Sequence, residues 1–373
     1  MLNACLQIPG GLAADHFGGT WLFGGCLLLS SVITLLTPGA ARESIALLTT
    51  LRFLSGLGEG VMLPASNALI ARWSVPLHRT RVVNMIFVGS DVGIIIGLSV
   101  TGVLCDYVSW QSAFYFFGLI GCLYSISWFF LCYDSPPMHP RISTAELEYW
   151  EQMIGIEDLT VRPPTPWQKI LTSVPVWALA VASFADSWGY FTLVTCLPLY
   201  MHDVLGLNMS KNGLFSAIPY LASVITIPLY GMLADWLRAP GRLSTTVVRK
   251  AFCVVGCVSS GCILVTLGLT GCNRALAITI LLVFEAFESI VFTTVSVNSL
   301  DLAPLHAGRI MGLIFTVGNL AAIIGPLIVG ALTYERSTHK EWQKVFVLTA
   351  IINGIGAIVY LIFGSGERQS WAE

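Results

Sequence analysis

The sequence predicts an all-α membrane protein built from two helical bundles. Of its 373 residues, 55% are hydrophobic and only 11% are charged, whereas soluble domains contain about 25% charged residues. Long apolar segments and an internal repeat complete the basis for this prediction. A net charge of −2 and the absence of basic runs argue against nucleic acid as a partner. The lipid bilayer is the partner that this composition requires.

Ten apolar segments are long enough to cross a bilayer, since a spanning helix needs about 20 apolar residues. Residues 1–14 resemble the second half of a further span. We therefore expect about ten complete transmembrane helices and a partial one. The ten segments fall near residues 20–37, 45–71, 82–105, 111–133, 175–200, 212–236, 247–270, 275–300, 307–333 and 345–365.

The internal repeat indicates a duplicated architecture. The run Gly11–Asp15 (GLAAD) recurs as Gly231–Asp235 (GMLAD), and paired halves are typical of secondary transporters. Six spans per half would leave this chain without its first helix and the start of its second. The expected division is an N-terminal bundle at 1–133, a linker at 134–173, a C-terminal bundle at 174–366 and a tail at 367–373.

Charge placement predicts the orientation in the membrane. With the 134–173 linker and the C-terminus in the cytosol, twelve Lys and Arg residues are cytosolic and six lie on the other side, as the positive-inside rule favours. Inside the linker, Ser143 and Glu146 form a capping-box pattern before Leu147, Trp150 and Ile154. We expect a short amphipathic helix there, either a regulatory element or a plain connector.

Arg52 and Glu59 are two charges within one apolar segment. A charge in a membrane helix costs about 2.5–3.5 kcal/mol on insertion scales, so it usually faces a partner, a cavity or a substrate. Seven residues separate the two, which places them on one helix face, roughly 10 Å apart. This pair favours the handling of an anion with a proton. Alternatively, Arg52 forms a gating ion pair or reaches the interface, and Glu59 makes a structural hydrogen bond.

Further polar residues in apolar segments are candidates for the same cavity. The acids either mark an altered substrate or extra proton sites, or one or two of them face polar edges or pair with each other. The tyrosines either donate hydrogen bonds to a polar ligand or pack in the core. These candidates are Asp91, Asp186, Glu285 and Glu288, and Tyr190, Tyr200 and Tyr220. The 10 cysteines lack metal-ligand spacing, and with no catalytic motif either, we expect no metal, no cofactor and no enzyme activity.

The whole chain resembles the major facilitator superfamily, and more narrowly solute carrier family 17, the group of sialin, vesicular glutamate transporters and sodium-phosphate cotransporters. The resemblance implies twelve helices in two bundles that alternate access to a central site. It rests on motifs in order along the chain, including Gln7–Gly11 (QIPGG), Arg52–Gly60 (RFLSGLGEG), Trp110–Tyr115 (WQSAFY), Ser135–Pro140 (SPPMHP) and Asn298–Pro304 (NSLDLAP).

The resemblance also implies residue roles. The arginine that matches Arg52 contacts the substrate anion in this family, and the acid that matches Glu59 takes part in proton coupling. Asn298 joins the three tyrosines as a substrate-binding candidate, and Asp15, Asp235 and Arg238 become gating candidates.

The chain also departs from the family pattern. The family's basic residue in helix 1 would precede Met1. Asp186 stands where the glutamate branch has an arginine, and Ser55 where sialin-like members have a second acid.

These observations lead to one expected function and to alternatives. The chain is expected to be a secondary active transporter of small organic anions, sialic acid-like acidic sugars or acidic amino acids. The expected coupling ion is a proton, with sodium as an alternative. The expected location is a lysosomal, vesicular or plasma membrane. The alternatives are a truncated, non-transporting membrane protein, a transporter of inorganic phosphate or another anion, and an anion channel.

Overall fold

The computed structural model describes residues 10, 13, 18–73, 79–148, 166–239, 242–270, 273–303, 306–334 and 338–372. Across these residues the regular structure is entirely helical, which confirms the predicted all-α class. Asp15 and most of the predicted partial span at 1–14 lie outside the described residues.

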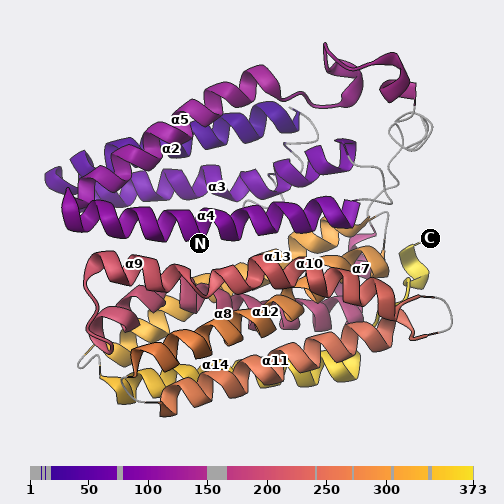
Figure 1. Ribbon diagram of the computed structural model, residues 1–373. Coiled ribbons are helices and arrows are strands. Elements are labelled where there is room, and N and C mark those ends of the chain that lie inside the picture. The colour runs from indigo at the N-terminus through magenta and orange to yellow at the C-terminus, as the bar shows by residue number, and fades with distance from the viewer. Residues whose placement is uncertain are drawn as a thin grey trace. The chain divides into compact units, whose positions relative to one another are not determined.

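The long helices follow the apolar segments closely, because a membrane-spanning segment must satisfy its backbone hydrogen bonds internally. Short helices α7 (Trp167–Thr172), η2 (Pro136–Met138) and η5 (Ser370–Ala372) lie between and after them. The helices in the apolar segments are α2 (Gly19–Glu43), α3 (Ile45–Trp73), α4 (Arg79–Tyr107), α5 (Trp110–Leu131), α8 (Val174–Asp203), α9 (Met209–Ala217), α10 (Tyr220–Leu237), α11 (Thr245–Leu269), α12 (Arg274–Leu302), α13 (Ala307–Thr333) and α14 (His339–Phe363) (Figure 1).

Within the described residues, nine candidate membrane spans are long and apolar enough to cross a bilayer, one of which combines α9 and α10. The segment predicted at 175–200 forms α8, which is 30 residues long but is not one of the nine. Polar residues such as Ser183, Asp186 and Ser187 lower its hydropathy, and all three are buried. A polar helix of this length is stable when protein surrounds it.

One contact unit of the chain comprises Met1–Val83 and Ser109–Thr165. In this unit α2 packs against both α3 and α5. Gly24 of α2 permits this approach, because a Cβ there would lie 2.8 Å from both Trp128 and Phe129 of α5. Asp134 closes the unit at one end: its Oδ1 accepts a hydrogen bond from Thr20 N at 2.8 Å, where a carboxylate favours the N-terminus of α2.

The other unit comprises Asn84–Val108 and Pro166–Glu373, so most of α4 groups with the later helices. Inside it α8 packs against α12, α13 and α14, and α11 packs against α12 and α14; these helices run alongside one another (Figure 1). The backbones of α4 and α9 touch at Gly102 and Gly213: a Cβ on Gly102 would lie 3.0 Å from the Gly213 Cα atom. Small residues permit such close helix contacts in membranes.

The segment predicted as one span at 212–236 is divided into two helices. Residue 217 ends α9 and Tyr220 begins α10. Pro219 lies at the break and has no N–H to donate to a preceding carbonyl, which accounts for the interruption.

The start of the predicted linker helix is visible. Ser143 Oγ accepts a hydrogen bond from Glu146 N at 3.2 Å, as the capping pattern requires, and residues 144–148 are helical. Trp150 and Ile154 lie outside the described residues. The amphipathic surface helix therefore stays a prediction.

Candidate functional site

Glu59 lies in a small hydroxyl cluster between α2 and α3. Its Oε1 accepts hydrogen bonds from Ser55 Oγ at 2.8 Å and from Ser30 Oγ at 3.2 Å. The two serine hydroxyls are themselves 3.2 Å apart. This arrangement holds the carboxyl group in place with neutral partners only.

Arg52 lies seven residues before Glu59 on α3, as expected, but the two side chains do not pair. Both are exposed in the structure. The Arg52 guanidinium lies over the ring of Phe114, with 5.5 Å between Cζ and the ring centroid. In the part of the chain that the structure describes, no acid forms an ion pair with Arg52. The exposed guanidinium therefore has its donors available to an anion.

The four further acids lie together in the second unit. Asp91 of α4, Asp186 of α8, and Glu285 and Glu288 of α12 are each at most 7% exposed. Asp91 Oδ2 accepts a hydrogen bond from Ser223 Oγ at 2.6 Å. The carboxyl groups of Asp91 and Asp186 both lie within electrostatic range of Glu285. No basic side chain in the described residues forms an ion pair with these acids.

The three tyrosine candidates fall into two environments. Tyr190 and Tyr220 pack edge-to-face, with ring centroids 6.4 Å apart. Both tyrosines lie within electrostatic range of Asp91 and Glu285. Tyr200 instead packs on Trp342 and Phe346, with centroid distances of 5.2 and 5.4 Å. The structure therefore favours the core-packing alternative for Tyr200 and places the other two beside the acids.

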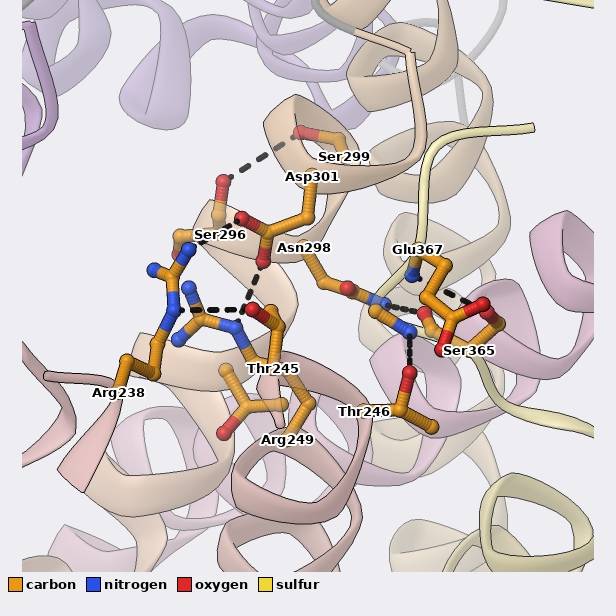
Figure 2. Close-up of polar contacts among 12 residues, drawn as sticks. Arg238, Thr245, Thr246, Arg249, Ser296, Asn298, Ser299, Asp301, Ser365 and Glu367 are labelled. Atoms are coloured by element: carbon orange, nitrogen blue, oxygen red, sulfur yellow. Dashed lines mark hydrogen bonds and ion pairs between the residues drawn. The ribbon is translucent and has the colours of Figure 1, made fainter. Parts of the chain in front are cut away.

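Asn298 is fully buried and ties the C-terminal tail to α12. Its Nδ2 donates to Tyr360 Oη at 2.6 Å and to the Ser365 carbonyl at 3.0 Å, a contact visible in Figure 2. Beside it, Gly366 N donates to Thr246 Oγ1 at 3.0 Å. Both amide hydrogens of Asn298 are thus used within the chain, which favours a structural role over the predicted contact with substrate.

The gating candidate Arg238 belongs to an ion cluster around Asp301 (Figure 2). Arg249 Nε lies 2.8 Å from Asp301 Oδ2, and Arg238 Nη2 lies 3.4 Å from Asp301 Oδ1. Arg238 Nε also donates to Thr245 Oγ1 at 3.2 Å. The cluster joins the C-terminal end of α10 to α11 and α12. Asp235 is exposed and takes no part in the ion pairs of the described residues, and its gating role stays a prediction.

Three residues that complete these clusters, Ser30, Ser55 and Asp301, were not among the predicted site residues. Ser55 was visible as an i, i+4 neighbour of Glu59 on one helix, which is hydrogen-bonding distance. Ser30 comes from another helix, and its contact depends on how α2 packs against α3. Asp301 was part of a recognised motif, but only the fold shows that it binds two arginines. Among the described residues no group of three His, Cys, Asp or Glu side chains is arranged to hold a metal ion.

Comparison with known proteins identifies the family. A sequence model described as the Major Facilitator Superfamily matches residues 1–326 and 241–373. The chain belongs to the Major Facilitator Superfamily. Sialin of Homo sapiens is 39% identical over 366 residues, which cover 98% of this chain and 74% of sialin. Vesicular glutamate transporter 3 of Danio rerio is 39% identical over 371 residues, which cover 98% of this chain and 62% of that relative.

These relatives confirm the narrower resemblance to solute carrier family 17. The chain is a multi-pass membrane transporter of the superfamily, related to sialin and the vesicular glutamate transporters. A solved structure supports the fold: the inward-facing, occupied form of a bacterial homologue of the human lysosomal transporter Spinster gives a TM-score of 0.69 at 14% identity. The match covers 97% of this chain and 86% of the bacterial chain.

Proposed function

We propose that this protein carries a small organic anion, an acidic sugar or an acidic amino acid, across a membrane together with a proton. In this scheme two helical bundles alternate access to the anion from opposite sides of the membrane. The relatives favour this substrate class, because one group is named for glutamate transport and the other is sialin.

The observation that carries the proposal is the state of Arg52. Its guanidinium is exposed on a membrane-spanning helix, without an acidic partner among the described residues. An arginine that faced lipid there would be costly, so it faces water or a bound anion. Its planar fork binds a carboxylate through two parallel hydrogen bonds and stays charged throughout the cycle. Phe114 orients the guanidinium from one side and leaves the edge donors free.

Glu59 is the proposed proton carrier beside the anion. It lies about two helical turns from Arg52, roughly 10 Å along the axis. Its partners Ser30 and Ser55 are neutral, so the carboxyl group can be protonated in one step of the cycle and ionised in another. In this scheme anion and proton bind the same face of α3, which links their movements.

Uptake into proteoliposomes tests the proposal. The purified chain is reconstituted, an inward-directed proton gradient is imposed, and labelled N-acetylneuraminate, glutamate and phosphate are supplied in parallel. The proposal predicts saturable, gradient-dependent uptake of an organic anion. Arg52→Ala abolishes this uptake, and Glu59→Gln removes its response to the gradient. Arg42→Ala, at the end of α2, is the matched control and retains uptake.

Three results would contradict the proposal. Phosphate uptake alone would favour the inorganic-anion alternative, and downhill flux without saturation would favour a channel. No uptake of any of the three anions by folded protein would favour the non-transporting alternative. Normal uptake by both Arg52→Ala and Glu59→Gln would refute the assigned residue roles.

For location, we propose a lysosomal or vesicular membrane, in line with the names of the relatives, with the linker and the C-terminus in the cytosol. The excess of basic residues on that side supports this orientation. Epitope tags in the linker and at the C-terminus, probed before and after selective permeabilisation, report the side directly.

A further inference from the structure

The second unit contains a buried group of acids that the proposed roles of Arg52 and Glu59 leave unused. Asp186 is 7% exposed, and Glu285 and Glu288 are each 3% exposed. One oxygen of Asp186 and one of Glu285 have no hydrogen-bond partner among the described residues, and Glu288 has the Ser260 hydroxyl as a hydrogen-bonding neighbour. Burying an ionised carboxylate without a compensating charge is costly, whereas the neutral acid avoids that cost.

The three acids belong to one site. Glu285 and Glu288 are three residues apart on α12, and therefore lie on one face. Glu288 reaches α8 beside Asp186: its Oε1 lies 2.5 Å from the position that a Cβ on Gly189 would occupy. The carboxyl group of Asp186 lies within electrostatic range of both Glu285 and Glu288. The glycine thus leaves room on α8 for a carboxyl group from α12.

A second kind of side chain also faces this site. Tyr220 is fully buried, and its hydroxyl has no partner among the described residues. Glu285, Asp91 and Tyr190 lie within electrostatic range of the Tyr220 hydroxyl. A hydroxyl that can both donate and accept a hydrogen bond is suited to a neighbour whose protonation changes.

Among the described residues, no basic side chain balances the three acids. The buried Arg249 is engaged by Asp301, which lies 13 residues beyond Glu288 on α12, or about 20 Å along the axis. Arg274 begins the same helix and donates to the Leu205 carbonyl, about 16 Å before Glu285. Across the described residues no group of these acids is arranged to hold a metal ion.

The other helices packed against the site contribute few titratable groups. C-terminal to Arg309, α13 contains no titratable side chain. C-terminal to Lys344, α14 contains one, Tyr360. The remaining groups that act on the acids or adjoin them are Asp91 from α4, Tyr190 from α8, Tyr220 from α10, and Cys253 and Cys257 from α11. All of these are neutral or acidic, so they add no positive charge.

We propose that Asp186, Glu285 and Glu288 form a buried proton-binding site in the second unit, which holds protons in this conformation and exchanges them when water reaches it. The inference deepens the proposed function and rests on it for its purpose, because a second proton site would let the later helices respond to the same gradient as Glu59. It also explains how an anion tolerates these acids: protonated, they do not repel it.

Infrared spectroscopy of the full-length protein in lipid tests the site without requiring transport. A protonated carboxyl group has a carbonyl stretch that a carboxylate lacks, and exposed carboxyl groups are ionised near pH 7. We expect a protonated-carboxyl band near neutral pH that weakens in Asp186→Asn, Glu285→Gln and Glu288→Gln and is lost in the triple variant. Asp106→Asn, an exposed acid on α4, is the matched control and leaves the band unchanged.

Two results would overturn the proposal. One is the same band in wild type and in all three single variants. The other is a wild-type spectrum without the band, together with a melting temperature that sodium or an alkylamine raises, which would mean that the acids are ionised and hold a cation. If the triple variant does not fold, the single variants decide the test. Because uptake is not measured, a failure here is distinct from a failure of the proposed transport.

Discussion

At the scale of single residues, buried charge is treated in two different ways within one unit. Asp301 is balanced by two arginines, Arg238 and Arg249. The acids Glu285 and Glu288, on the same helix, have no basic partner among the described residues. In general, basic neighbours favour the ionised form of a carboxyl group, whereas burial without such neighbours favours the neutral form. One helix therefore carries both a permanent ion cluster and a proposed proton site.

The ion cluster gives a stability prediction. Arg249 is 2% exposed and Asp301 is 11% exposed, so Arg249→Ala leaves the largely buried Asp301 carboxylate with only the longer contact to Arg238. Removing one partner of a buried pair costs about 3–5 kcal/mol. We expect a clearly lower melting temperature in detergent for this variant.

Arg242→Ala is the matched control for Arg249→Ala. The Arg242 side chain is exposed and lies over Trp236, with 4.0 Å between Cζ and the ring centroid, a contact worth about 0.5–1 kcal/mol at an exposed site. Equal melting temperatures for the two variants would contradict the assigned importance of the buried pair.

At the scale of elements, apolar patterning predicted the helices well, because length and hydropathy determine which segments can cross a bilayer. It could not predict the break at Pro219, where a local covalent property interrupts a continuous apolar run. Nor could it predict that Arg52 and Glu59 are exposed. Exposure depends on how other helices pack against α3. The seven-residue spacing of the two charges is the same whether or not another helix covers that face.

The contact between α4 and α9 gives a prediction for an element. A Cβ on Gly213 would overlap the Leu98 carbonyl and would lie 2.9 Å from the Gly102 Cα atom. Since backbone atoms cannot move aside as a side chain can, Gly213→Ala is expected to destabilise the protein by about 1–3 kcal/mol. Thermal unfolding followed by helix content measures this loss.

Gly93→Ala on α4 is the control for this contact. A Cβ there would meet no atom within 4 Å, and alanine is favoured over glycine in helices by about 1 kcal/mol. Gly93→Ala should therefore be neutral or stabilising. A Gly213→Ala variant as stable as Gly93→Ala would show that the two helices do not need close backbone contact.

At the scale of the whole molecule, the family follows from motifs spread along the entire chain, and the relatives confirm it. The sequence made the acids of the second unit candidates for one cavity, but how they are arranged depends on the packing of α4, α8 and α12. Sequence reasoning also assigned Asn298 and Tyr200 to the substrate, whereas the fold uses both in internal packing. Residue type thus predicted which positions are unusual, and only the packing shows which of them act together.

The central claim is that anion and proton move together through this protein. It is tested most directly by recording the internal pH of proteoliposomes when an organic anion is added outside, with no proton gradient imposed. Coupled transport of anion and proton predicts that the lumen acidifies as the anion enters, and that Arg52→Ala abolishes both anion entry and acidification. Saturable anion uptake with no change in internal pH, under conditions that clamp the membrane potential, would contradict it.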